Sequence, residues 1–301
     1  MYQGEINFIA GHIRGTYSKI MLTAVAGRPD LETLVKVKLP PLPGSVLKIA
    51  SLLQDYNVSQ KAIAAAIGYD PMLAARVLRL ANSPVYGFQQ QMTNLTEAVG
   101  AVGNRAIYNM TMIGVVADSF AHEIRNSAAG RDIWLHSLAT GFAARELGIT
   151  LNLRSVDEAF TCGLLHDIGE LLLFRADPKL FAEISGLAEN EDTTDIEKEV
   201  LGFDHAQLGA LAARRWNLPE AVCNMILYHH DPTATTESLL MTNLINIADR
   251  LSYRKNRELP IDESFMFSES VIMLRLDEPQ LEAVWEKVLV NMREVVKAFF
   301  R

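Results

Sequence analysis

Histidine and aspartate residues that could ligate a metal gather in the chain beyond residue 130. Five short segments, LHS, LLHDIG, FDHAQLG, LYHHDP and NIADRLS, supply His136, His166, Asp167, His205, His229, His230 and Asp249. Imidazole nitrogen together with carboxylate oxygen suits Fe, Mn, Zn or Ni better than Ca, which requires an all-oxygen set. No thiolate is needed. We therefore expect these seven residues to form one site that holds one or two divalent transition-metal ions.

His166 and Asp167 also have a purely structural explanation. We expect them inside one helix that is apolar on nearly every side, because leucine and isoleucine surround them in FTCGLLHDIGELLLF. Burying an imidazole and a carboxylate costs several kcal/mol unless each is paired, hydrogen-bonded or bound to a metal. A core histidine bonded to a carbonyl and an aspartate paired with an arginine would meet the same demand.

The other candidates have structural alternatives as well. His205 could cap a helix that starts near Asp204, and Asp249 could pair with an arginine of another helix. His229 and His230 precede Asp-Pro at an expected helix C-terminus, where an imidazolium interacts favourably with the helix dipole. Each structural explanation is common when taken by itself. If the residues form no metal site, however, all of these explanations must apply at the same time.

Composition and charge exclude several classes of function. The formal net charge of −8 leaves no basic field to attract nucleic acid or an anionic membrane. The two cysteines, Cys162 and Cys223, lie far apart without a CxxC pair, which is typical of a reducing compartment. The N-terminus does not resemble a signal peptide, and no apolar run reaches the ~18 residues of a membrane span. We expect a cytoplasmic protein that does not insert into membranes.

The elements that must position these residues are predicted to be all α-helical. No alternating β-branched segments bounded by hairpin signals occur, and glycine and proline divide the chain into helical pieces. A helix is expected from about Ser45 to Asp55. Further helix starts are indicated at Ser59, at Asp70 before Pro71, at Asn94 with Glu97, at Ser155 with Glu158, and at Thr194 with Glu197.

Two helical segments could serve an interface instead of the core. The paired helices at 59–82 superficially read as a helix-turn-helix carrying Arg76 and Arg79, although their apolar face and the acidic chain favour core packing. The C-terminal segment is amphipathic, and we expect its apolar face to pack on the protein's own core more readily than on a partner or a second copy in a homodimer. This face comprises Leu281, Val284, Trp285, Val288, Leu289, Met292, Val295, Val296 and Phe299.

Several long segments in order resemble the HDOD family of bacterial signalling domains, within the HD superfamily and related to the HD-GYP phosphodiesterases. They are LPPLPGSVLKIASLL, IGYDPMLAARVLRLANSPVYG and TNLTEAVGAVGNRAIYNM, then WLHSLATGFAARELG, EAFTCGLLHDIGELLL, GFDHAQLGALAARRWNLPEAV and ILYHHDP. The resemblance covers about Leu39 to Pro232. It implies an N-terminal extension at 1–35, a first helical lobe at 36–130, and an HD-like lobe with the C-terminal amphipathic helix at 131–301, in a single two-lobed unit.

The resemblance also assigns the ligands. Relative to HD hydrolases, His136, His166, Asp167 and Asp249 match the minimal metal quartet, whereas the other three histidines match additional ligands of multi-metal enzymes. Asp132 stands where some of those enzymes place a further carboxylate. It also lies one turn before His136, so the two could instead form a hydrogen-bonded pair.

Departures from the related phosphodiesterases concern activity rather than fold. Those enzymes carry a lysine four residues after the motif histidine and Gly-Tyr-Pro after the double histidine. This chain has Glu170 at the first place and Asp231-Pro232-Thr233 at the second. Because phosphate transition states need positive charge, a glutamate at that position argues against cleavage of cyclic dinucleotides.

Two functional hypotheses follow. The first is a regulatory protein that passes a signal to protein partners through its helical surfaces, with the cluster serving structure or sensing. The second is a metal-dependent phosphohydrolase acting on a phosphoester or nucleotide, in which Asp167 is catalytic. Its phosphate contacts would come from arginines near the motifs in sequence, namely Arg131, Arg145, Arg214 and Arg215.

Overall fold

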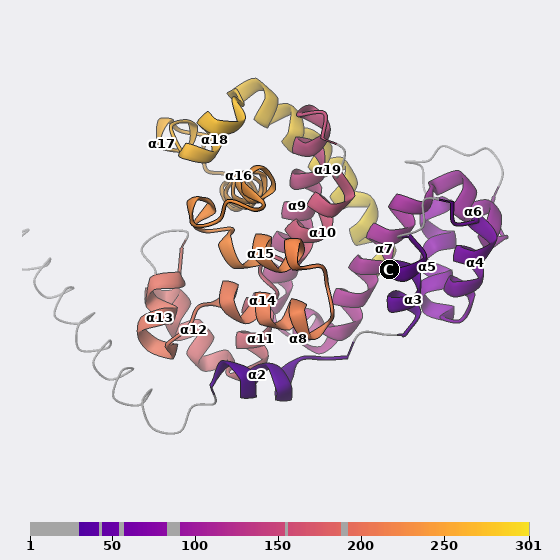
Figure 1. The fold of residues 1–301 in the computed structure, drawn as a ribbon, viewed down its shortest axis with the longest axis horizontal. Helices are drawn as coiled ribbons and strands as arrows, with labels where there is room; N and C mark the ends of the chain where they lie inside the picture. Colours follow the sequence, from indigo (N-terminus) through magenta and orange to yellow (C-terminus); the bar gives the residue numbers. More distant parts are fainter. Residues whose placement is uncertain are drawn as a thin grey trace, which may run out of the picture.

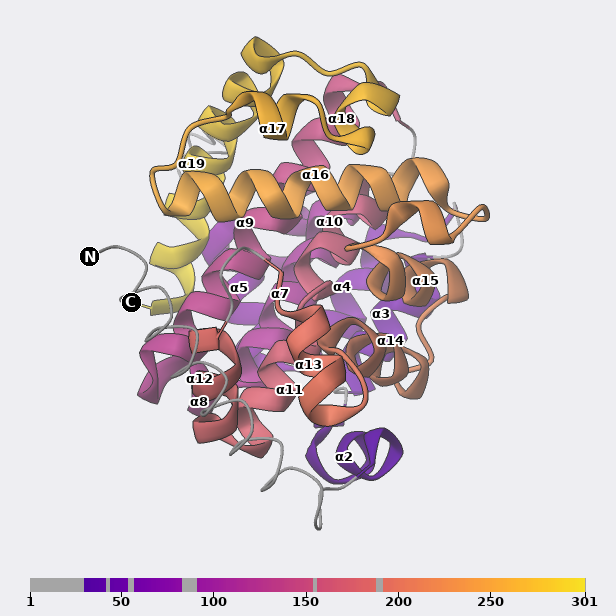
Figure 2. The ribbon, with the colours of Figure 1, turned by 90° about the vertical axis from the view of Figure 1, so that its left-hand side faces the viewer.

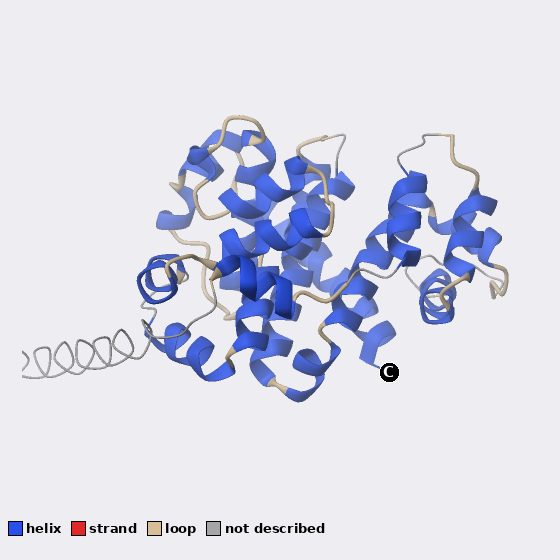
Figure 3. Ribbon diagram, turned by 60° about the horizontal axis from the view of Figure 1, so that its bottom comes forward, coloured by secondary structure: helices blue, strands red, loops and turns tan. Residues whose placement is uncertain are grey.

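The computed structural model describes residues 30–41, 44–53, 57–82, 91–153, 156–187 and 192–300. Over these residues the chain is built of helices without a strand, which confirms the all-α prediction (Figure 3). None of the helices in this described part is both long and apolar enough to cross a lipid bilayer.

A smaller group of helices forms a lobe on the right of Figure 1. Its apolar core is built around Ile49, Ile63, Ile67, Val77 and Val99. The side chains of Ser59 and Asn94 cap helices as expected, and Asp70 accepts the backbone N–H groups of the turn that starts at Pro71. Its helices are α3 (Gly44–Leu53), α4 (Gln60–Gly68), α5 (Pro71–Ala81), α6 (Leu95–Val102) and the first half of α7 (Asn104–Ser119).

The apolar faces of α4 and α5 are turned into this core. Ile63 and Ile67 on α4 and Leu73 and Val77 on α5 are all buried. Arg76 on α5 lies against α7, where its guanidinium forms two hydrogen bonds of 2.6 Å to the Asp118 carboxylate. Helices α4 and α5 therefore contribute to the core. The sequence favoured this role over that of a helix-turn-helix.

The larger group of helices faces the viewer in Figure 2. It contains every candidate ligand. Its core surrounds Trp134, Leu138, Phe160, Leu172 and Leu244. Its first helices are α8 (Ala121–Asn126), α9 (Ala128–Thr150), α10 (Val156–Leu165), α11 (Ile168–Ala176), α12 (Pro178–Leu187), α13 (Thr194–Leu201) and α14 (His205–Arg215). They are followed by α15 (Glu220–Tyr228), the 3-10 turn η1 (Pro232–Ala234), α16 (Leu239–Asn256), α17 (Glu263–Met266), α18 (Glu269–Leu274) and α19 (Glu278–Phe300).

Helix α7 joins the two cores. Ile107 and Met110 belong to the smaller core, whereas Met112 and Val116 belong to the larger one. Helix α2 (Leu31–Lys38) lies under α11 and α14, away from α3 to α6 (Figure 1). The expected boundaries at 35 and 130 stay a prediction, although α2 lies across the first of them and packs on the larger core.

The C-terminal helix α19 packs on α9 and α5. Leu281, Val284, Trp285 and Val288 are buried in the larger core, as expected for the apolar face, whereas Leu289 is 42% exposed. Most of the amphipathic face is thus used within the chain.

Two local predictions were wrong. His166 and Asp167 do not lie inside a helix, because α10 ends at Leu165 and α11 begins at Ile168. Thr194 does not cap α13, since Thr193 is the N-cap residue and its side chain caps no backbone N–H. The expected cap at Ser155 lies outside the described residues, as does the end of the helix expected to reach Asp55.

Candidate metal centre

All seven expected ligands meet in one cluster at the centre of the larger lobe. His136 comes from the middle of α9, and Asp249 from the middle of α16. His166 and Asp167 occupy the break between α10 and α11, where neither backbone is constrained to continue the helix. His205 is the first residue of α14, while His229 is the C-cap residue of α15 and is followed by His230.

The first group in the cluster consists of His136, His166, Asp167 and Asp249. One potential ligand atom from each lies within 4.8 Å of the others. The Nε2 atom of His136 is 2.9 Å from Asp249 Oδ1 and 3.4 Å from Asp167 Oδ2. The Nε2 atom of His166 is 3.0 Å from Asp167 Oδ2 and 3.5 Å from Asp249 Oδ1. The quartet implied by the resemblance is therefore assembled in space.

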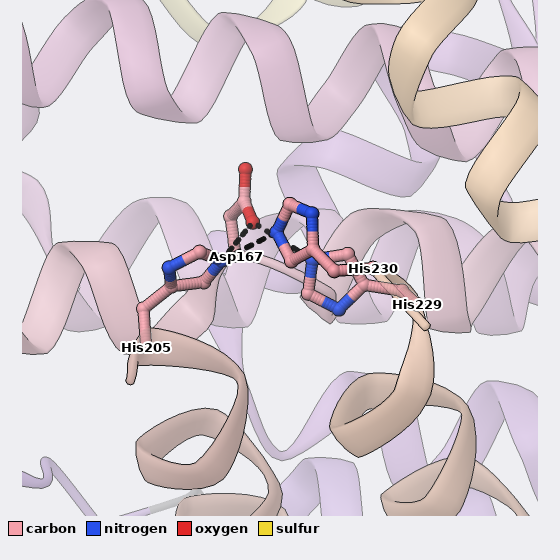
Figure 4. A group of neighbouring side chains, drawn as sticks. All are labelled: Asp167, His205, His229 and His230. Carbon is pink, nitrogen blue, oxygen red and sulfur yellow. Dashed lines mark hydrogen bonds and ion pairs between the residues drawn. The ribbon is translucent and has the colours of Figure 1, made fainter. Parts of the chain in front are cut away.

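The second group consists of Asp167, His205, His229 and His230 (Figure 4). Asp167 Oδ1 is 3.4 Å from His205 Nε2 and 3.6 Å from His229 Nε2. His230 Nε2 lies 2.9 Å from His205 Nε2. Asp167 belongs to both groups, with Oδ2 toward the first and Oδ1 toward the second.

Hydrogen bonds fix the orientation of three imidazoles. His166 Nδ1 is 2.8 Å from the Gly163 carbonyl, and His229 Nδ1 is 2.7 Å from the Ile226 carbonyl. A carbonyl only accepts, so each Nδ1 carries the proton and donates. His205 Nδ1 is held in the same way, 2.8 Å from the Glu197 carboxylate. In all three rings Nε2 is left to face Asp167, which is the arrangement that metal-binding histidines adopt.

The buried Nε2 atoms supply a test of whether a metal fits. Those of His166 and His229 have no hydrogen-bond partner among the described residues. With Nδ1 protonated, the neutral ring directs a lone pair from Nε2 toward a carboxylate oxygen, and two acceptors repel each other unless a cation lies between them. A proton or a divalent metal ion between the Nε2 atom and the carboxylate oxygen would satisfy both acceptors. Nitrogen and oxygen donors of this kind suit a transition-metal ion.

The charges of the cluster are strongly coupled. Burial alone lowers the pKa of His166, but the carboxylates of Asp167 and Asp249 outweigh it and raise that pKa to about 10. Burial would raise the pKa of Asp167 and of Asp249, yet the neighbouring imidazoles hold both well below the usual value. Burial, together with nearby His229 and His205, lowers the pKa of His230 to about 3. The carboxylates of Asp167 and Asp249 therefore stay ionised at neutral pH, and His230 stays neutral, as a metal ligand must.

Two glutamates outside the expected ligand set adjoin the site. Glu197 and Glu170 form a third group with His205, with potential ligand atoms within 4.8 Å of one another. Burial and the Asp167 charge raise the pKa of Glu170 to about 8. The sequence predicts Glu197 as part of a helix cap, whereas its side chain accepts hydrogen bonds from His205. Glu197 lies on the buried side of α13, one turn after the N-cap residue Thr193. A charged residue on an apolar helix face was the feature of the sequence that could have indicated a role in the site.

Close approach of two helices brings His205 to Asp167. Gly169 on α11 packs so tightly against the His205 backbone that a Cβ atom there would overlap the His205 carbonyl oxygen. A Cβ atom added to Gly209 on α14 would lie only 3.2 Å from the Ile168 side chain and 3.1 Å from the Ile226 side chain. Glycine at these places lets α11 and α14 come together, because no side chain keeps their backbones apart.

A cavity of about 1040 Å³ opens on the cluster, which is about the upper limit for small-molecule pockets. Asp132 lines it and is exposed. The alternative in which Asp132 pairs with His136 is not formed among the described residues, where His136 contacts Asp249 instead. Asp249 likewise pairs with histidines rather than with an arginine. Asp204, not His205, caps α14.

The four arginines expected to contact phosphate do not line this cavity. Arg145 pairs with Glu146, Arg214 with Glu220 and Arg215 with Glu32. Arg131 is exposed on α9. Closeness in sequence to the histidine segments was misleading, because side chains on adjacent helical positions point in different directions.

Known proteins resemble this chain over most of its length. An uncharacterized protein of Treponema pallidum (strain Nichols) is 27% identical over 258 residues, which are 82% of this chain and 50% of the relative, so the chain spans about half of that protein. A solved structure of a phosphohydrolase candidate from Shewanella amazonensis SB2B superposes with a TM-score of 0.71 at 27% identity, covering 89% of this chain and 97% of the other.

A second solved structure supports the fold. A candidate signal transduction protein from Marinobacter aquaeolei VT8 superposes with a TM-score of 0.73 at 21% identity, over 97% of this chain and 66% of the other. The model of the HDOD domain family matches residues 39–232, which include the ligands on α9 to α15. The helical fold, the order of the motifs and this match agree, and the chain belongs to the HDOD domain family.

Proposed function

We propose that this HDOD protein binds two divalent transition-metal ions in its histidine and aspartate cluster and hydrolyses a phosphoester there. One observation carries the proposal: Asp167 offers one carboxylate oxygen to each of two ligand groups. A shared carboxylate is the feature by which two-metal sites keep their ions a few ångströms apart. The likeness to the Shewanella phosphohydrolase candidate supports this assignment.

Each ligand has a defined task in this proposal. His136, His166 and Asp249 would hold one ion and His205, His229 and His230 the other, with Asp167 between them. When bound, the ions would polarise the phosphate and make water nucleophilic near neutral pH. The protein's own part is to keep the Nε2 atoms aimed inward through Gly163, Ile226 and Glu197. Asp167 is the residue on which catalysis would depend.

Cyclic dinucleotides are not the proposed substrates. Glu170, which replaces the lysine of the related phosphodiesterases, lies beside Glu197 and His205 in the cluster. A carboxyl group there supplies no positive charge for a phosphate, whether it is protonated or ionised.

Metal analysis tests the proposal. Protein purified without chelator and reconstituted with Mn²⁺ or Fe²⁺ should hold about two ions per chain and should hydrolyse p-nitrophenyl phosphate or bis(p-nitrophenyl) phosphate. Asp167→Asn should lose both ions and the turnover, whereas Asp195→Asn, an exposed aspartate on α13, should behave as wild type. Less than about a tenth of an equivalent of metal after reconstitution would reject the proposal.

A second function, that of a regulatory protein in which the cluster serves structure or sensing, is favoured by the charge of the cavity wall. Exposed Asp132, Asp192, Asp231 and Glu269 line the cavity, and their charges oppose entry of an anionic substrate. In that case the helical surfaces would pass the signal to a protein partner. Full metal occupancy without turnover of either phosphoester probe would favour this function over hydrolysis.

A further inference from the structure

One face of α16 forms a polar wall of the cavity. Its cavity-lining residues recur at intervals of three and four, so they share one side of the helix. They are Asn243, Asn246, Asp249, Arg250, Tyr253, Asn256 and Arg257. Figure 2 shows α16 as a long helix across the larger lobe. The wall therefore runs on from the metal ligand Asp249 to the C-terminal end of the helix.

Arg250 is a half-buried cation on this wall. Its guanidinium lies over the Phe265 ring, 5.0 Å from the ring centroid, and has no carboxylate partner among the described residues. Arg254, one turn further, is instead paired with Asp262 at 2.9 Å. A guanidinium kept in a cavity without a carboxylate is available to a bound anion, which it can contact through two parallel hydrogen bonds.

The far end of the wall carries a stacked pair. The guanidinium of Arg257 lies over the Tyr253 ring, 3.7 Å from its centroid. Arg257 follows Arg250 by two helical turns, which is ~10 Å along the axis. A flat guanidinium supported by an aromatic ring offers its other face to a planar group. The two arginines are the only lysine or arginine residues that line the cavity in the described part of the chain.

We propose that Arg250 binds the phosphate of a nucleotide-sized organic phosphate, whose planar ring lies at the Tyr253 and Arg257 pair. The distance between the arginines fits a phosphate and a ring separated by a sugar, and the cavity has room for such a ligand. This inference rests on the proposed function, because the phosphate at Arg250 would be the one presented to the metal centre. Arg250 would also supply the positive charge for the phosphate that Glu170 cannot supply.

Calorimetric titration tests the inference without relying on turnover. Inorganic phosphate and adenosine 5′-monophosphate are titrated into wild-type protein, both loaded with Mn²⁺ and metal-free, and into Arg250→Gln, Arg250→Lys and Arg257→Ala. Arg293→Gln removes one positive charge at an exposed position of α19 and is the control. Circular dichroism establishes that each variant is folded, and a Mn²⁺ titration measures its metal affinity.

Three results are expected. Arg250→Gln should weaken both ligands at least about tenfold, with Arg250→Lys between it and wild type, because a charged hydrogen bond is lost. Arg257→Ala should weaken the nucleotide about threefold to tenfold and leave inorganic phosphate unchanged. Arg293→Gln should match wild type, and Mn²⁺ affinity should be the same in all four variants.

The inference is overturned if wild type binds neither ligand in either state, or if Arg250→Gln binds phosphate as wild type does. An unchanged nucleotide affinity in Arg257→Ala overturns the position of the ring. Failure of wild type to bind Mn²⁺ contradicts the proposed function alone, and the titrations of metal-free protein then decide the role of Arg250.

Discussion

His205 donates two hydrogen bonds to a single carboxylate oxygen of Glu197, one from its backbone N–H at 2.6 Å and one from Nδ1 at 2.8 Å. Glu197 is 1% exposed and belongs to α13, whereas His205 begins α14. This contact ties the start of one helix to the preceding one. It also fixes which nitrogen of His205 faces Asp167, so a residue outside the expected ligand set orients one of the ligands.

Replacement of Glu197 by glutamine should weaken metal binding about tenfold to a hundredfold, because His205 loses a charged acceptor that orients its ring. The affinity for Mn²⁺ measured by calorimetry tests this. Glu199→Gln, which changes an exposed glutamate on the same helix, should leave the affinity unchanged. Equal affinities in the two variants would show that the contact with His205 does not matter for the metal.

Metal binding should release protons and become tighter as pH rises. With a pKa of about 10, His166 holds a proton at neutral pH that must leave before Nε2 can ligate. Affinity should therefore increase by up to about tenfold per pH unit for each proton released, as long as the pH is below that pKa. Titrations in buffers of different ionisation enthalpy measure the number of protons, and a value of zero would contradict the expected exchange.

Gly169→Ala should lower both stability and metal affinity, because its Cβ would overlap the His205 carbonyl oxygen and push α14 away. A backbone clash of this kind costs about 1 to 3 kcal/mol or more. Gly186→Ala is the matched control, since a Cβ there meets nothing within 4 Å on the helical backbone of α12. It should stabilise the protein by about 0.5 to 1 kcal/mol. Thermal unfolding separates the two outcomes.

Glu123→Gln should destabilise the fold by about 2 to 3 kcal/mol, because it leaves Arg175 without its carboxylate. Arg175 donates to both Glu123 oxygens, at 2.6 and 2.8 Å, and to the Ser119 carbonyl. Burial opposes ionisation of Glu123, yet these bonds outweigh it and lower its pKa below 4.5. The free energy of unfolding, measured in urea, tests the expected loss.

The same pair gives a dependence on pH. Because the pKa of Glu123 is lower in the folded protein, its contribution to stability is present above pH 4.5 and is lost as pH falls through the lowered value. Glu123→Gln should therefore reduce the acid sensitivity of unfolding. Glu183→Gln, an exposed change on α12, should retain the wild-type pH dependence.

Helical structure could be predicted from local pattern and the candidate ligands from residue type and resemblance, but contacts between helices could not. Ser59 and Asn94 cap helices as expected, since capping depends on residues within one turn. The apolar run around His166 predicted burial correctly, yet the break at His166 and Asp167 was missed because leucine and isoleucine on both sides continue the helical pattern across it. Arg250 was missed for a related reason, since its place in the cavity depends on where α16 packs.

The sequence by itself determined that the protein is all-helical, belongs among HDOD-like chains and carries seven imidazole and carboxylate groups able to hold metal. The helical class follows from residue type and periodicity, and the likeness to HDOD chains follows from the resemblance of several long segments in the same order. Only the tertiary structure decided that Asp167 turns one oxygen to each ligand group, that Glu197 orients His205, and that Arg250 rather than Arg214 lines the cavity. These relations depend on how helices distant in sequence pack together, and the packing is set by many side chains at once rather than by any local pattern.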